Sequence, residues 1–346
     1  MSLVPIVPHL FVGVDIAAAT FTAAWSRPDE PVSTPRTYAQ EPHGFAALHT
    51  QLAATTVPPA ETLIVMEATG SYWIALAVTL HAAGYPVSVI NPLQAHHFAK
   101  AQLRRAKTDG LDAQDLAHLA VLLRPPVWAP PPAIYHEVRQ RLLVRDGLVT
   151  MRQQARNQLH ALVQWPVVVA QAEAPLRAVI GDLDARIAVL EGEIAQVLAG
   201  SEWAASLGYL TSAPGIGLLT AAWLLVATLN FTLGETPEAV VAGCPLGRTG
   251  LAPVPRQSGT SIRGAAQIGH SGNERLRTAV YLATLSAARF NPMIRTFYER
   301  LRAAGKPVKV ARCAAARKLL HLAWALVTKQ QRFDPLRHLP PPAVAA

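Results

Sequence analysis

The sequence has few cysteines, fewer acidic than basic residues, and no apolar run long enough to cross a membrane. Its two cysteines, Cys244 and Cys313, form neither a disulfide framework nor a Cys-x-x-Cys metal pair, which favours a reducing, cytoplasmic compartment. The longest apolar run, residues 218–229, is shorter than the roughly 20 residues of a membrane-spanning helix, so no membrane association is expected. The first ten residues have no basic segment followed by an apolar stretch, which excludes a signal peptide.

The shortage of acidic residues gives the chain a basic surplus. It has 31 Lys and Arg against 22 Asp and Glu, a formal net charge of +9. Such a surplus favours a polyanionic partner, nucleic acid before an anionic membrane, although a merely soluble basic protein has the same property. With 346 residues and 51% hydrophobic residues, the chain is not disordered and is long enough for two or three domains.

The first 90 residues alternate β-rich runs with helical segments. Strands are expected at residues 11–15, 20–25, 62–66 and 86–90, and helices at residues 44–53 and 72–83. This alternation predicts an α/β domain with a partly parallel sheet, and a hairpin formed by the first two runs makes the sheet mixed.

Four acidic residues stand where such a sheet binds ligands. Asp15 and Glu67 end two predicted strands, and open α/β sheets bind ligands at the carboxyl ends of strands. Asp109 and Asp112 lie three residues apart at the start of a helical run over residues 111–123, which places them on one helix face. Taken singly, each acid also fits a capping or surface role, with Asp109 as N-cap and Asp112 in the first turn.

Together, the four acids point to metal chemistry. Carboxylates gathered at one place repel each other and raise each other's pKa. Oxygen ligands without His or Cys suit Mg²⁺ or Mn²⁺. The chemistry that follows most naturally is two-metal phosphoryl transfer on nucleic acid.

Basic side chains and a glycine turn fit contacts with phosphate. The stretch before the second acid pair is basic, as either a phosphate-guiding rim or a solvated helix face; its members are Arg104, Arg105 and Lys107. Gly215 and Gly217 lie in a Pro-Gly-Ile-Gly turn that resembles a helix-hairpin-helix turn, where free backbone N–H groups bind phosphate, although glycines also favour an ordinary tight turn. Further candidates for backbone contacts lie on the last helices: Arg275, Arg277, Lys309 and Arg312.

The middle of the chain predicts a helical arm. Five prolines within residues 124–132 mark a boundary, and long helices are expected at residues 135–163 and 174–199. The second helix carries a heptad seam that serves either an intramolecular hairpin or a contact between protomers: Leu176, Ile180, Leu183, Ile187, Leu190, Ile194 and Val197. Gly200 and Gly208 indicate a break in helical structure.

A Gly-, Pro- and Ser-rich segment, residues 243–272, predicts a loop or hairpin. Ser258, with Arg256 and Arg263 nearby, fits a nucleophile with charge-stabilising neighbours, or a plain polar turn. We expect four parts: a catalytic domain (1–125), a helical arm for oligomerisation (126–205), a mostly helical C-terminal domain with the serine loop (206–335) and a flexible tail (336–346).

Two groups of motifs resemble the DEDD transposases of the IS-one-ten family, which include pilin-gene invertases. In the first half the matching motifs are Val12-Gly13-Val14-Asp15, Met66-Glu67-Ala68-Thr69-Gly70, Val89-Ile90-Asn91-Pro92 and Lys107-Thr108-Asp109-Gly110-Leu111-Asp112-Ala113. In the second half they are Pro214-Gly215-Ile216-Gly217, Gly250-Leu251-Ala252-Pro253, Gln257-Ser258-Gly259 and Gly272-Asn273-Glu274-Arg275-Leu276-Arg277. The resemblance spans nearly the whole chain in the same order.

The resemblance implies a RuvC-like N-terminal domain of the RNase H superfamily, with Asp15, Glu67, Asp109 and Asp112 as its four acids, and Ser258 as the residue that attacks DNA. It implies dimers that assemble into tetramers, in which the acids of one protomer and the serine of another complete an active site. It also implies a structured bridge RNA, which pairs with donor and target DNA, and action at the nucleoid of a prokaryotic cell.

The expected function is therefore recombination that excises and inserts an insertion sequence. Two departures from the family pattern are an apparent insertion at residues 244–249 and His270-Ser271 at a place where a basic residue is common. A RuvC-like junction endonuclease that uses water, or a decayed transposase that binds nucleic acid without catalysis, are the alternatives.

Overall fold

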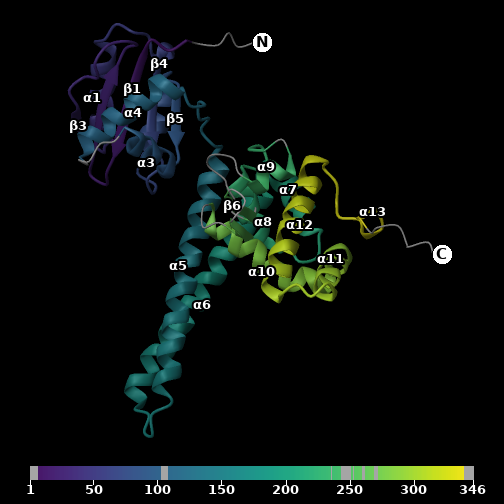
Figure 1. The fold of residues 1–346 in the computed structure, drawn as a ribbon. Coiled ribbons are helices and arrows are strands. Elements are labelled where there is room, and N and C mark those ends of the chain that lie inside the picture. The colour runs from purple at the N-terminus through teal and green to yellow at the C-terminus, as the bar shows by residue number, and fades with distance from the viewer. Residues whose placement is uncertain are drawn as a thin grey trace, which may run out of the picture. The chain divides into compact units, whose positions relative to one another are not determined.

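The computed structural model describes residues 7–102, 108–234, 236–242, 251, 253–258, 262–268 and 272–338. The chain divides into two compact units, Met1–Pro130 and Pro131–Ala346 (Figure 1). Arg104, Arg105 and Lys107, the predicted basic rim, lie outside the described residues. None of the described helices combines the length and apolar character needed to cross a bilayer.

The first unit is built on a mixed sheet of five strands in the order β3-β2-β1-β4-β5 (Figure 1). The strands are β1 (Leu10–Ile16), β2 (Thr20–Ser26), β3 (Arg36–Ala39), β4 (Thr62–Glu67) and β5 (Val87–Ile90). The β1–β2 and β2–β3 pairs are antiparallel, whereas β4 lies parallel to both β1 and β5. The predicted mixed sheet is confirmed, with β3 as an additional edge strand.

Alternating side chains of the central strands bury both faces of this sheet, as a strand's period of two requires. In the described part of the unit the α-helices are α1 (Pro42–Ala53), α2 (Trp73–Ala82), α3 (Pro92–Ala101) and α4 (Asp109–Leu123), and a short 3-10 helix, η1 (Pro59–Glu61), precedes β4. On one face Val12 and Val14 share a core with α1 and α2. On the other face Phe11 and Val65 pack against α4, with α3 at the margin.

The second unit begins with a long helical hairpin, α5 (Ala133–Leu162) and α6 (Ala170–Ala199), which we call the arm (Figure 1). Every residue of the predicted seam on α6 is buried or half-buried, and α6 packs along α5. Ion pairs between Arg145 and Glu191 and between Arg152 and Asp184 bind the two helices in antiparallel register. The heptad seam therefore serves an intramolecular hairpin.

Further helices and a β-hairpin make up the rest of what the structure describes in the second unit. They are α7 (Ala204–Thr211), α8 (Leu218–Thr228), α9 (Pro237–Ala242), β6 (Pro253–Ser258), β7 (Ile262–Ile268), α10 (Glu274–Phe290), α11 (Pro292–Ala303), α12 (Val308–Thr328) and α13 (Pro335–His338). Helix α8 is buried almost all round, which fits its apolar sequence. Its core includes Val138 and Ile194 at the base of the arm. Arm and C-terminal helices thus share one core, and a domain boundary at residue 205 stays a prediction.

Candidate active site

Asp15 and Glu67 lie next to each other at the carboxyl edge of the sheet. Val14 of β1 is paired with Met66 of β4 in parallel register. The next residues, Asp15 and Glu67, therefore lie beside each other at the ends of neighbouring strands. Both acids are partly buried. The register thus places the backbones of the two acids side by side, and a shared metal site at their carboxylates stays a prediction.

Asp109 and Asp112 occupy the first turn of α4, as their spacing predicted. The helix begins two residues earlier than expected, at Asp109, because Thr108 is its N-cap: the Thr108 hydroxyl accepts a hydrogen bond from the Leu111 N–H at 3.3 Å. The alternative role of Asp109 as N-cap is therefore wrong. With Thr108 capping the helix, the Asp109 carboxylate is not needed for that purpose.

Gly13 lets α4 approach the sheet closely enough to bring its acids to Asp15. A Cβ atom at position 13 would lie 2.2 Å from both the Ala113 carbonyl oxygen and the Ala117 nitrogen, which are backbone atoms of α4. No side chain fits in that space. This contact has a signal in the sequence: a glycine inside a buried strand often marks a place where another backbone approaches closely.

The charges of the four acids converge on Asp15. Burial, together with the neighbouring carboxylates of Asp112, Asp109 and Glu67, raises the pKa of Asp15 from 3.8 to about 6, although a hydrogen bond from the Ile16 backbone opposes the rise. The described residues contain no group of three or more His, Cys, Asp and Glu side chains arranged tightly enough to hold a metal ion. The acids are thus close enough to affect the pKa of Asp15, but their side chains are not arranged as the ligands of one metal ion.

Thr69 holds Glu67 in place and was missed as a site residue by sequence reasoning. Its hydroxyl donates a hydrogen bond to Glu67 Oε1 at 2.9 Å. The loop continues through Gly70, whose φ of 58° lies in the left-handed region that glycine adopts readily. The Glu-x-Thr spacing was the available signal, because a hydroxyl two residues after a strand-end acid can reach back to it.

Ser258 is the last residue of β6, at the turn end of the β6–β7 hairpin. Its backbone is paired with Ile262, and Gln257 is paired with Arg263. Arg256 is paired with Gly264, beyond an irregularity in the register. The predicted loop or hairpin is therefore a hairpin, and it brings the backbones of Ser258 and the two arginines to one end of a two-stranded ribbon.

The Pro-Gly-Ile-Gly turn is packed against α10. Gly215 has a φ of +100°, and a Cβ atom there would lie 2.5 Å from the Ala287 Cβ. The Asn291 side-chain amide donates to the Pro214 carbonyl at 3.3 Å. Gly217 is the exposed N-cap of α8, which has no side-chain cap. Gly215 thus has a packing role in the turn, and phosphate contacts at both glycines stay predictions.

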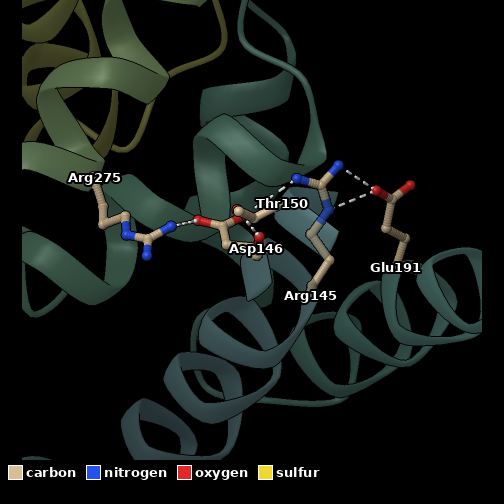
Figure 2. Close-up of polar contacts among 5 residues, drawn as sticks. All are labelled: Arg145, Asp146, Thr150, Glu191 and Arg275. Carbon is tan, nitrogen blue, oxygen red and sulfur yellow. Dashed lines mark hydrogen bonds and ion pairs between the residues drawn. The ribbon is translucent and has the colours of Figure 1, made fainter. Parts of the chain in front are cut away.

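Arg275, predicted to contact nucleic acid, forms an ion pair with the arm (Figure 2). Its Nη1 lies 2.9 Å from Asp146 Oδ2, and Arg145 Nη1 lies 3.3 Å from Asp146 Oδ1. Arg145 in turn donates from Nε and Nη2 to Glu191 Oε1, at 2.8 and 2.6 Å. The Asp146 carboxylate is only 16% exposed. Sequence reasoning missed this link because its partners are 129 residues apart.

The other residues predicted to contact the nucleic-acid backbone lie on α10 and α12. Arg277 is half-buried in the first turn of α10. Lys309 and Arg312 lie near the start of α12, a helix without acidic residues, and neither forms an ion pair with an acid in the described part of the chain.

Two family models match the chain. Residues 12–165, which include all four acids, match the DEDD-type IS110 model described as "Transposase". Residues 208–299, which include Ser258 and the glycine turn, match the model "Transposase IS116/IS110/IS902 family". The chain belongs to the IS110 family of transposases. It is therefore a DNA recombinase, of the class of enzymes that cleave and rejoin DNA.

Curated relatives of this transposase agree. The pilin gene-inverting protein of Moraxella bovis is 29% identical over 331 residues, 95% of this chain and 98% of the relative. The pilin gene-inverting protein of Moraxella lacunata is 29% identical over 333 residues, with the same coverage. A protein of insertion element IS110 from Streptomyces coelicolor is 30% identical over 218 residues, 61% of this chain and 52% of the relative.

Proposed function

We propose that this transposase excises and inserts an insertion sequence by site-specific recombination, in which Ser258 attacks DNA at a site that depends on a divalent metal ion. The observation that carries the proposal is the electrostatic effect of three carboxylates, those of Asp112, Asp109 and Glu67, on Asp15, whose pKa is raised to about 6 by burial and by these charges. Mutually repelling acids at the carboxyl edge of a sheet are typical of a site that binds cations.

The residues present fit Mg²⁺ or Mn²⁺. The donors are carboxylate oxygens from two strands and one helix, without His or Cys, as these hard cations prefer. Asp15, Glu67, Asp109 and Asp112 would hold the metal. The Thr69 hydroxyl, 2.9 Å from Glu67 Oε1, would fix the orientation of that ligand. A bound divalent cation supplies charge stabilisation at phosphorus and activates the attacking hydroxyl.

Ser258 carries out the covalent step in this proposal. Its Oγ forms a bond to phosphorus as the bond from phosphorus to the leaving sugar oxygen breaks, and the proton lost by the hydroxyl is balanced by protonation of the leaving oxygen. The phosphoserine link keeps the energy of the phosphodiester for rejoining. The position of Ser258 at the turn end of a two-stranded ribbon supports this role. Arg256 and Arg263 would stabilise charge that develops at phosphorus.

The wider assembly is also part of the proposal. A mixed sheet whose adjacent parallel strands end in acids supports a RuvC-like catalytic domain of the RNase H superfamily within residues 1–125. The serine belongs to a different compact unit from the acids, which is compatible with sites completed between protomers of a tetramer. Donor and target DNA would be paired with a bridge RNA, and phosphates would contact Gly217, Lys309 and Arg312.

A suicide-substrate assay tests the serine step. Nicked DNA that traps a covalent intermediate should give a protein–DNA adduct with wild-type protein in Mg²⁺. Ser258→Ala should abolish the adduct, whereas Ser261→Ala, a matched hydroxyl three residues on, should leave it. Hydrolysed ends that survive Ser258→Ala would instead indicate a nuclease that uses water.

Separate arms test the metal and the RNA. Asp109→Asn should abolish the adduct and leave DNA binding intact, whereas Glu61→Gln, which changes a surface acid of the same unit, should have no effect. Strand cleavage by Asp109→Asn at the wild-type rate would refute the metal assignment. Recombination that is equally efficient without any transcript from DNA beside the gene would refute the RNA guide.

A further inference from the structure

Helices α11 and α12 carry a concentration of positive charge that the chain does not neutralise. Residues 292–328 contain eight Lys and Arg but a single acid, Glu299. In the part of the chain that the structure describes, none of these eight cations forms an ion pair with a carboxylate. On the arm, by contrast, Arg141, Arg145 and Arg152 form ion pairs with acids of the opposite helix. Unpaired cations gathered on neighbouring helices favour an anionic ligand.

Two of these cations are held against one aromatic ring. Arg300 of α11 places its Cζ 5.3 Å from the centroid of the Phe297 ring, and Lys318 of α12 places its Nζ 4.8 Å from the same centroid. Both distances lie within the range of a cation–π interaction. Phe297 is half-buried and packs against the core of the second unit. The ring therefore fixes a guanidinium from one helix and an ammonium from the next at a defined place on the surface.

The local field at this place is positive. Burial and the nearby Arg300 charge lower the pKa of Lys318. Burial also lowers the pKa of His321, and although Glu238 opposes this, Arg317 and Lys318 lower it further. The single negative charge of Glu238, whose carboxylate lies 3.9 Å from His321 Nδ1, thus does not balance the positive charges around it. Like charges held together in this way cost free energy that an anion would recover.

We propose that Arg300 and Lys318, positioned on the Phe297 ring, form a binding site for backbone phosphate of a nucleic acid strand. The ligand chemistry is a phosphodiester, because a guanidinium and an ammonium both donate to phosphate oxygens and because the positive surface continues along both helices. The inference rests on the proposed function, since a recombinase must hold its polynucleotide away from the reacting bond. Both residues lie beyond the second family match, which ends at residue 299.

The salt dependence of binding tests the site. Full-length protein is titrated in EDTA with a DNA duplex and with an RNA duplex of the same length, and the observed binding constant is followed against salt concentration. Each phosphate contact on duplex DNA contributes about 0.9 to the slope of log K against log salt. Lys318→Gln and Arg300→Gln should each make this negative slope shallower by about 1, and the double variant should make it shallower by about 2.

Lys329→Gln is the matched control. Lys329 is the exposed C-cap of the same helix α12, so its replacement makes the same charge change without touching the ring, and the slope should stay at the wild-type value. If the slope becomes shallower on only one of the two duplexes, that duplex is the polynucleotide that occupies the site. Wild-type slopes for Lys318→Gln and Arg300→Gln on both duplexes would overturn the site. Because EDTA prevents cleavage, failure of the serine mechanism would leave this result unchanged.

Discussion

The arm and the edge of the sheet use charge in opposite ways. On the arm, opposite charges meet: Arg145 donates to Glu191 at 2.6 Å, and Arg152 donates to Asp184 at 2.5 Å. At the sheet edge, like charges meet, and Asp15 has its pKa raised to about 6 by burial and three other acids. Charges that are balanced within the chain stabilise its fold. Charges left unbalanced destabilise the fold slightly and indicate where a ligand of opposite sign binds.

Two glycines, one in each region, give the largest expected contrast. Gly13→Ala should lower the free energy of unfolding by roughly 3 kcal/mol, because its Cβ would overlap backbone atoms of α4 at 2.2 Å. Displacement of α4 should also move Asp109 and Asp112 and reduce strand cleavage by roughly 100-fold or more. Urea unfolding and the cleavage assay measure the two effects.

The matched change on the arm is Gly192→Ala. Nothing lies within 4 Å of a Cβ at this position in α6, so alanine should raise stability by about 0.5–1 kcal/mol through its better helix propensity. Cleavage should be unaffected. Equal stability changes at both positions would contradict the close approach of α4 to β1.

The second prediction asks how much the balanced charges contribute. Asp146→Asn keeps the size of the side chain but removes the anion shared by Arg145 and Arg275, and it should cost about 1–3 kcal/mol because the carboxylate is largely buried. Asp182→Asn removes an exposed ion-pair partner of Arg186, four residues further along α6, and should leave the stability close to that of the wild type because solvent screens the pair. Thermal unfolding of both variants provides the comparison.

The third prediction concerns pH and the unbalanced acids. In EDTA the folded protein holds the Asp15 proton more tightly than the unfolded chain, with pKa values of about 6 and 3.8. The stabilisation that this proton provides is complete below pH 3.8 and is lost as pH rises through about 6. Asp15→Asn stays neutral, so at pH 8 it should be more stable than wild type by about 1 kcal/mol, allowing for partial solvent exposure.

The difference between the two unfolding curves isolates Asp15 from other groups that titrate in this range. The difference should be small at pH 4 and grow to its full value near pH 7, and Mg²⁺ should reduce it. Asp182→Asn should follow the wild-type curve throughout. A constant difference from pH 4 to pH 8 would mean that neither burial nor the other three acids raise the pKa of Asp15 in the folded protein.

Local sequence patterns were enough to predict most of the fold. Short β-rich or apolar runs located β1, β2, β4 and β5, because these strands are buried, and the heptad seam located α6. Strand β3 was missed because its four residues are exposed or half-buried and carry no apolar alternation. The break expected between Gly200 and Gly208 is present, because α6 ends at Ala199 and α7 begins at Ala204. Gly208 itself lies inside α7, whose Leu210 is fully buried, so tertiary packing overrides the low helix propensity of glycine there.

The site was predictable only where local chemistry defines it. Strand ends and a three-residue helical spacing pointed to the acids, because both rules act over a few residues. The contact of Gly13 with α4 and the ion pair of Arg275 with Asp146 depend on segments that are distant in sequence. Arg275 was therefore grouped with the free basic residues, although the chain itself provides its anion.

The Arg275–Asp146 pair limits how this recombinase can be re-engineered. It joins the start of α10, directly after the serine hairpin, to the middle of α5 (Figure 2). A chimera that receives the hairpin and α10 from a relative keeps the joint only if the donor brings a cation to position 275 and the host retains an acid at position 146. Designers who exchange segments between relatives should therefore move α5 together with the serine hairpin and α10, as one unit.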